Sequence, residues 1–323
     1  IPPERIVVQS THTHSGPDVI GLWGPDEKTT GFNPEYVSGL VAKVSDQVVA
    51  AYANRQSVQM LWGRTTCTGW AVNDSEPGHV DPSVNVLQFQ TPQGKSLATL
   101  TSFACHPTVL DNENRLVTAD WPGAFYQMVD SSLGGVNMYL QGAVGAWIQP
   151  ETPERTFALA DKYGVDLAEK VLAALPSARP VAGTPILFAS RPFQMPIENP
   201  KFAAISQAGL APRNFDQVSV ATEVVAFSVG NAQFATHPGE TAPVFAEQTR
   251  DLMKDADGPR IVLGLGLDEI GYVCPRSYFE NPKAYTAAEY ITSMSPGISA
   301  GDTMMKALNS ILPLQTLNQP GNR

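Results

Sequence analysis

Apolar and polar residues change their spacing along the chain in a way that predicts interleaved strands and helices. Short β-branched or alternating apolar runs indicate strands, and apolar residues three or four positions apart indicate helices. The predicted strands are residues 5–10, 58–62, 84–89, 97–103, 137–141, 186–192, 218–229, 232–236 and 260–266. The predicted helices are residues 35–54, 121–132, 155–175, a segment that follows Pro243, and 299–311. This order predicts an α/β fold whose core is a mixed sheet with flanking helices.

A proline-rich stretch is the main interruption of this pattern. Residues 176–185 contain prolines at positions 176, 180 and 185, which is typical of a linker or of a boundary between lobes. No internal repeat or low-complexity tract is visible. A chain of 323 residues is therefore predicted to form one domain, residues 1–323, with a lobe boundary near residues 176–185.

The composition of the chain limits the kinds of molecule that it is expected to bind. A net charge of −10 and a pI near 5 disfavour nucleic acid, and they disfavour an anionic membrane bound through a basic patch. No apolar run approaches the ~18–20 residues that span a bilayer. The three cysteines form neither a metal knuckle nor a disulfide framework, which leaves one disulfide or buried free thiols. No signal peptide is visible, and a chain that starts Ile1-Pro2-Pro3 leads us to expect more sequence upstream.

Two histidines stand close together after the first predicted strand, in Thr11-His12-Thr13-His14-Ser15-Gly16-Pro17. If the strand extends this far, His12 and His14 point to the same face, because side chains alternate along a strand. Two imidazoles at that spacing either share a metal ion, or one binds it while the other acts as an acid or base. A pair of ordinary turn histidines fits this motif equally well.

Four other residues are ambiguous when each is considered alone. His106 ends a predicted strand, where a histidine is more often structural. Glu240 is either a metal ligand, a general base or a first-turn acid that suits the helix dipole. Asp120 is either catalytic or a plain helix N-cap, and Tyr272 is either a ligand or a buried core residue. His106, Glu240 and Tyr272, like His12 and His14, lie near the C-terminal ends of predicted strands or just beyond, where sites assemble in α/β sheets.

The chain resembles the neutral (non-lysosomal) ceramidase family. The matching motifs occur in the family's order over residues 11–272. They are the His-Thr-His segment, Phe103-Ala104-Cys105-His106-Pro107-Thr108, Ala119-Asp120-Trp121-Pro122-Gly123, Gln141-Gly142-Ala143-Val144-Gly145, Pro238-Gly239-Glu240 and Gly271-Tyr272. The resemblance implies a ceramidase-like catalytic domain with Zn²⁺ held by His12, His106, Glu240 and Tyr272. It also implies that His14 either contacts the metal ligands without binding the ion or stabilises an oxyanion, and that the substrate is an N-acyl amine. Either His14 or Asp120 is expected to assist the catalytic step. Finally, it implies a role in lipid metabolism and a secreted or periplasmic location.

Two departures from the family's pattern modify these expectations. The family's glycine-rich loop continues as Gly-Asp-Val-Ser-Pro, whereas this chain has Gly145-Ala146-Trp147-Ile148-Gln149-Pro150, without a serine. A zinc-activated water therefore fits better as the nucleophile than a serine at this loop. The upstream segment of the family's fold and its C-terminal immunoglobulin-like domain are also expected to be absent.

The resulting hypothesis is a zinc-dependent amidohydrolase that acts on a small-molecule or lipid substrate. Two alternatives remain open: a zinc esterase or lactonase with the same site, and a non-catalytic binding homologue that kept its metal. The altered loop favours the binding homologue, whereas retention of every presumed ligand argues against it. Trp23, Trp121 and Trp147 lie in the presumed site loops and are candidates to line a pocket.

Overall fold

A five-stranded mixed sheet organises the first half of the chain. The computed structural model describes residues 1–183, 185–215, 218–254 and 257–314. The strand order is β5-β4-β3-β1-β7, and only the β4–β5 pair is parallel. These strands are β1 (Gln59–Thr66), β3 (Ser83–Gln90), β4 (Ser96–Phe103), β5 (Val136–Gln141) and β7 (Arg179–Pro180).

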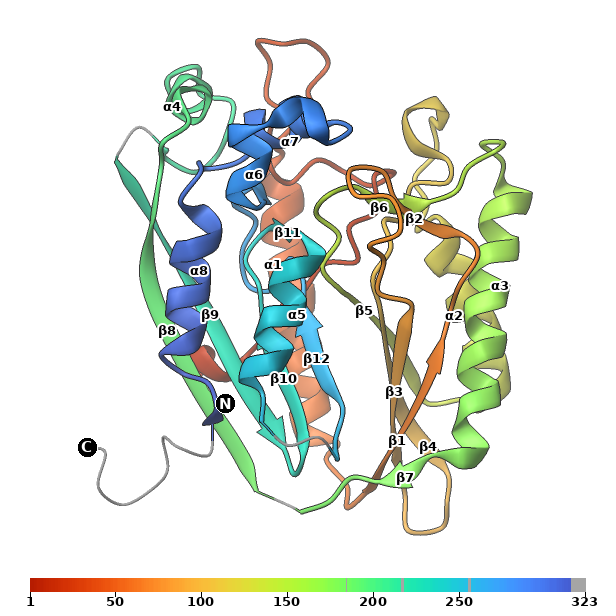
Figure 1. The fold of residues 1–323 in the computed structure, drawn as a ribbon. Helices are drawn as coiled ribbons and strands as arrows, with labels where there is room; N and C mark the ends of the chain where they lie inside the picture. Colours follow the sequence, from red (N-terminus) through yellow and green to blue (C-terminus); the bar gives the residue numbers. More distant parts are fainter. Residues whose placement is uncertain (184, 216–217, 255–256, 315–323) are drawn as a thin grey trace, which may run out of the picture.

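Two helices cover one face of this sheet (Figure 1). Helix α2 (Trp121–Leu133) lies in the crossover from β4 to β5, as a parallel pair requires. Helix α3 (Phe157–Ala174) packs beside it and buries its apolar stripe, including Leu159, Leu167 and Val171. This sheet and these helices share one hydrophobic core.

A four-stranded sheet organises the second half, with the order β12-β10-β9-β8. Helix α5 (Pro243–Leu252) connects the parallel pair of β10 and β12. Helices α5 and α8 (Ala300–Asn309) share a second hydrophobic core with strands of this sheet (Figure 1). The strands are β8 (Ile186–Pro196), β9 (Ser219–Val229), β10 (Ala232–Thr236) and β12 (Arg260–Leu263). The predicted α/β fold with a mixed sheet is confirmed, although the strands form two larger sheets instead of one.

The two larger sheets share a hydrophobic core, and short elements lie at one end of them (Figure 1). Two small sheets lie there, β2–β6 and the parallel pair β11–β13. Their strands are β2 (Ala71–Asn73), β6 (Ile148–Pro150), β11 (Glu240–Thr241) and β13 (Tyr272–Val273). The other helices are α1 (Pro34–Ala53), α4 (Pro200–Gln207), α6 (Arg276–Glu280) and α7 (Ala288–Ser293). The 3-10 turns are η1 (Pro3–Arg5), η2 (Asp111–Glu113), η3 (Leu175–Ser177) and η4 (Pro282–Ala284).

The predicted strand at residues 5–10 is wrong. The turn η1 occupies Pro3–Arg5, and only an isolated bridge joins Gln9 to Gly266. The side-chain amide of Gln9 instead donates to the carbonyls of Gln141 and Gly264, at 2.5 and 2.7 Å. A side chain, and not a strand ladder, therefore links the ends of β5 and β12 at this point.

Helix α1 forms where its apolar spacing predicts a helix, with the side chain of Asn33 as its N-cap. None of its residues is buried, and Val41 and Val49 are 59% and 68% exposed. Within the described part of the chain, this helix keeps its apolar stripe uncovered. No described helix has both the length and the apolarity to cross a membrane.

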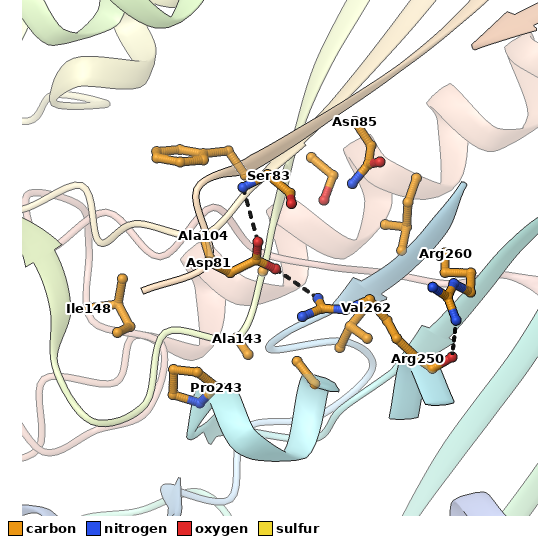
Figure 2. A pocket seen from close by; sticks show the side chains of 15 residues that line it. Asp81, Ser83, Asn85, Ala104, Ala143, Ile148, Pro243, Arg250, Arg260 and Val262 are labelled. Atoms are coloured by element: carbon orange, nitrogen blue, oxygen red, sulfur yellow. Dashed lines mark hydrogen bonds and ion pairs between the residues drawn. The ribbon is translucent and has the colours of Figure 1, made fainter. Parts of the chain in front are cut away.

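The segment between β2 and β3 is tied to α5 by two polar contacts. Asp81 pairs with Arg250 at 2.9 Å, on the wall of a cavity of about 30 Å³ between the sheets (Figure 2). This volume holds roughly two water molecules. His79 bridges Glu76 and Glu247, each at 2.9 Å. Because α5 begins just after β11, these contacts anchor the helix that follows Glu240.

The His79 bridge makes stability depend on pH. Partial burial alone would lower the pKa of His79, but its hydrogen bonds to Glu247 and Glu76 outweigh this effect and raise the pKa. The charged form therefore stabilises the fold fully below the unfolded-state pKa of about 6.5, and this contribution is lost as the pH rises through the higher folded-state value. We predict that the wild type exceeds His79→Gln in urea midpoint at pH 5.5 and that the gap narrows by pH 9. A gap that stays constant between these pH values contradicts the assignment.

Candidate metal centre

The rings of His12 and His14 lie next to each other, but strand alternation is not the cause. His12 has a φ of 69°, a left-handed conformation that ends any extended run before the motif. The hydroxyl of Thr13 donates to the carbonyl of Thr118, which fixes the loop between them. The Nε2 atoms of His12 and His14 lie 3.4 Å apart. A left-handed turn therefore brings the two rings together, where strand alternation was expected to do so.

His106 enters the same cluster from the end of β4 and is buried. Its Nδ1–H donates to the carbonyl of Ile148 at 2.6 Å. A neutral imidazole carries a single N–H, so its Nε2 presents a lone pair. That Nε2 lies 3.0 Å from Oε2 of Glu240, which also presents lone pairs. A second proton on His106 or a bound cation would satisfy both atoms.

Glu240 and Tyr272 are brought together by the parallel pairing of β11 and β13, in which they are direct partners. Gly271 makes this approach possible, because its φ is 87° and an added Cβ would lie 2.1 Å from the carbonyl oxygen of Met294. The hydroxyl of Tyr272 hydrogen-bonds Glu240 and accepts from the indole N–H of Trp147 at 3.2 Å.

The spacing of these donors suits a metal ion. Atoms bound about 2.0–2.1 Å from a tetrahedral zinc lie about 3.3 Å from one another. Nε2 of His12 is 3.4 Å from Oε1 of Glu240 and 3.4 Å from Nε2 of His14. One nitrogen from each of His12, His14 and His106 lies within 4.8 Å of the others. Three imidazoles around one carboxylate favour a shared cation over a proton on His106 alone.

The charges of the cluster are consistent with this donor set. Burial would raise the pKa of Glu240, but His12 and His106 bring it well below its usual range. Burial and repulsion by His12 and His106 lower the pKa of His14 to about 3. At neutral pH, Glu240 is therefore ionised and His14 carries a free lone pair, as metal ligands or proton acceptors require.

Asp120 lies beside the cluster as the N-cap of α2. Its carboxylate accepts backbone N–H groups of Trp121, Leu110 and Val109 at 2.8, 2.9 and 3.1 Å. These bonds fold the segment after His106 onto the start of α2, and the indole of Trp121 donates to the carbonyl of His106. The contacts are those of an N-cap, and a catalytic role for Asp120 stays a prediction.

Three contacts were missed by sequence reasoning, because each joins residues far apart in the chain. Oδ1 of Asp111 lies 3.9 Å from Nδ1 of His14, and its other oxygen pairs with Arg155 at 3.4 Å. Burial and the nearby Glu240 raise the pKa of the Glu269 carboxyl well above its usual value. Tyr290 on α7 lies 6.2 Å from Tyr272 between ring centroids.

Of the three candidate tryptophans, Trp147 alone is found beside Tyr272, whereas Trp121 is buried in the core and Trp23 is 60% exposed.

Comparison with known proteins finds similarity to one family in the first half of the chain. Residues 3–156 match the profile described as neutral/alkaline non-lysosomal ceramidase, N-terminal. Over this range, just under half of its length, the chain is similar to the neutral/alkaline ceramidases. The matched range contains His12, His14, His106 and Trp147, whereas Glu240 and Tyr272 lie beyond it.

Individual ceramidases match at low identity. Neutral ceramidase of Mycobacterium tuberculosis is 23% identical over 154 residues, which are 43% of this chain and 24% of that protein. Neutral ceramidase B of Dictyostelium discoideum is 23% identical over 146 residues, which are 41% of this chain and 20% of that protein.

Solved ceramidase structures share the fold. The crystal structure of neutral ceramidase from Pseudomonas aeruginosa superposes with a TM-score of 0.75 at 16% identity, over 94% of this chain and 60% of that one. A ceramidase complexed with C2 gives a TM-score of 0.76 at 15% identity, over 97% and 62%. The chain thus spans less than two thirds of the ceramidases that it matches.

Removing one ligand should test the donor set. We predict that His106→Ala lowers zinc affinity by about a hundredfold or more, since loss of a ligand costs at least as much as loss of a residue that supports one. Glu35→Ala, which removes an exposed carboxylate of α1, should leave zinc affinity unchanged. Zinc content and affinity by competitive chelator titration measure both. Full zinc occupancy in His106→Ala would show that the ligand assignment is wrong.

Proposed function

We propose that this ceramidase homologue is a zinc-dependent hydrolase that cleaves the amide bond of an N-acyl amine with water as the nucleophile. The observation that carries the proposal is the pair formed by His106 and Glu240. The hydrogen bond from Nδ1 of His106 to the carbonyl of Ile148 turns the lone pair of Nε2 towards Glu240. Nε2 lies 3.0 Å from Oε2 of that carboxylate, an arrangement that a divalent cation stabilises. His12, His106, Glu240 and Tyr272 would hold the ion. When bound, zinc lowers the pKa of a water molecule towards about 7 and polarises a carbonyl group.

His14 is the proposed general base and acid. Its side chain is 41% exposed, and it lies next to the proposed ligands His12 and His106. Desolvation and the neighbouring His12 and His106 lower its pKa, so the ring is neutral at working pH and presents a lone pair within the cluster. Asp111 faces the far nitrogen of the same ring, at 3.9 Å, which favours the orientation in which Nε2 points into the cluster.

A nucleophile from the glycine-rich loop is disfavoured. Residues 145–150 include no serine, threonine or cysteine, and Ile148 contributes its buried carbonyl to His106 instead. Ser15 is the hydroxyl adjacent to His14, and its oxygen accepts from the side chain of Asn114 at 3.0 Å. We therefore propose water, and not a residue of this loop, as the nucleophile.

The similarity to ceramidases suggests a substrate class, a location and a metabolic role. The matched relatives are named neutral ceramidases, so the proposed substrates are N-acyl amines, ceramide-like or other. A secreted or periplasmic location and a role in lipid metabolism follow from the same resemblance. An ester or lactone would use the same polarised carbonyl, so amide and ester panels must be compared directly.

The test is hydrolysis by the zinc-loaded chain. We predict turnover of N-acyl amines, including ceramide in detergent micelles, with loss on chelation and recovery when zinc is returned. Turnover of esters alone would support an esterase or lactonase. Stoichiometric zinc without turnover in either panel would contradict the hydrolase and support the binding homologue. Ser15→Ala should retain zinc and turnover, and an acyl-enzyme burst that this substitution abolishes would contradict a water nucleophile.

A further inference from the structure

An aromatic corner stands directly against the proposed metal centre. It consists of Trp147 and Tyr290, with the ligand candidate Tyr272 at its base. The centroids of Trp147 and Tyr290 are 5.5 Å apart at 57°, and those of Tyr272 and Tyr290 are 6.2 Å apart at 72°. These separations are typical of interacting aromatic rings. Tyr290 is 45% exposed, so the corner presents a ring to incoming molecules.

The turn that carries Trp147 has an unusual backbone conformation. Ala146 and Trp147 both adopt left-handed conformations, with φ of 65° and 57°. Residues other than glycine rarely adopt this conformation. Gly145 packs so closely against β11 that an added Cβ would lie 2.5 Å from the carbonyl carbon of Thr241. The strained turn thus sits directly on the strand that carries Glu240.

Hydrogen bonds also join the segment that carries Trp147 to the segment that precedes α7, the helix of Tyr290. The backbone N–H of Ser75 donates to the carbonyl of Ala146 at 3.3 Å, and its hydroxyl donates to the carbonyl of Thr286 at 2.7 Å, just before α7. The carbonyl of Met294, at the end of α7, accepts the backbone N–H of Tyr272 at 3.0 Å. The backbone segments that carry Trp147 and Tyr290 are therefore linked to each other and to the segment of Tyr272.

We infer that this corner is a specificity subsite for substrates that carry a planar ring next to the scissile carbonyl. The inference rests on the proposed hydrolase function and names the substrate class of the same site. Trp147 touches the hydroxyl of Tyr272, so the aromatic wall begins at the metal cluster itself. A ring attached close to the carbonyl would reach Tyr290, whereas a flexible alkyl chain gains no stacking there. An aromatic contact is worth about a three- to tenfold preference.

The test compares two amides of ethanolamine, N-phenylacetyl and N-octanoyl, with the zinc-loaded protein. The phenylacetyl amide should be favoured about three- to tenfold in kcat/KM. Tyr290→Leu should remove the preference, and Tyr290→Phe should keep it because the ring remains. Tyr36→Leu makes the same change at a tyrosine of α1, 42% exposed, and should leave the preference as it is in the wild type. Circular dichroism and zinc content establish that each variant is folded.

Two results would overturn the inference. One is equal kcat/KM for the two amides in the wild type, and the other is an unchanged preference in Tyr290→Leu. Both leave the proposed hydrolase function standing. If neither amide is turned over and the hydrolase proposal fails, calorimetric binding of phenylacetate and octanoate to the same variants decides the question. Stronger binding of phenylacetate that Tyr290→Leu removes supports the subsite, and binding unaffected by Tyr290→Leu contradicts it.

Discussion

The hydrogen bond from His106 to the carbonyl of Ile148 is the interaction on which the site depends. It assigns the N–H to Nδ1 and turns the lone pair of Nε2 towards Glu240. The same carbonyl belongs to β6, which pairs with β2, so the orientation of one imidazole depends on a small sheet outside the two main ones. His106 in turn lies at the end of β4 in the first sheet, whereas Glu240 follows β10 in the second. Each main sheet therefore supplies part of the donor set, and the contact between the sheets sets its spacing.

Close backbone approaches let the chain converge on this point. Gly145 lies against β11, and Gly271 lies against the carbonyl of Met294, in places where any side chain would collide with backbone. These contacts hold the ligand candidates Glu240 and Tyr272 between the strained turn at residues 146–147 and α7. The consequence is a site whose donors and aromatic walls are positioned by the same few backbone contacts. Such preorganisation is what a catalytic metal site requires of its scaffold.

Much of the fold followed from local pattern, because strands and amphipathic helices have distinct periods. Helix α3 and strands β3, β4 and β9 lie close to their predicted bounds. The strand at residues 5–10 failed because a β-branched run needs a partner, and the side chain of Gln9 makes the contacts that a ladder would make. Five candidate residues were named from motifs, and the structure brings them together in one cluster: His12, His14, His106, Glu240 and Tyr272. The contacts of Asp111 and Tyr290 were not predictable, since no local period encodes which loops meet. The left-handed turns at His12 and Trp147 were missed for a related reason, since neither residue is a glycine.

The central claim is that His12, His106 and Glu240 share one zinc ion. Diffraction from crystals grown with zinc, measured on both sides of the zinc absorption edge, tests it most directly. The account predicts a single strong anomalous peak about 2.0–2.2 Å from Nε2 of His12, Nε2 of His106 and a carboxylate oxygen of Glu240. An anomalous peak elsewhere, or none at this cluster in crystals that hold zinc, would contradict it.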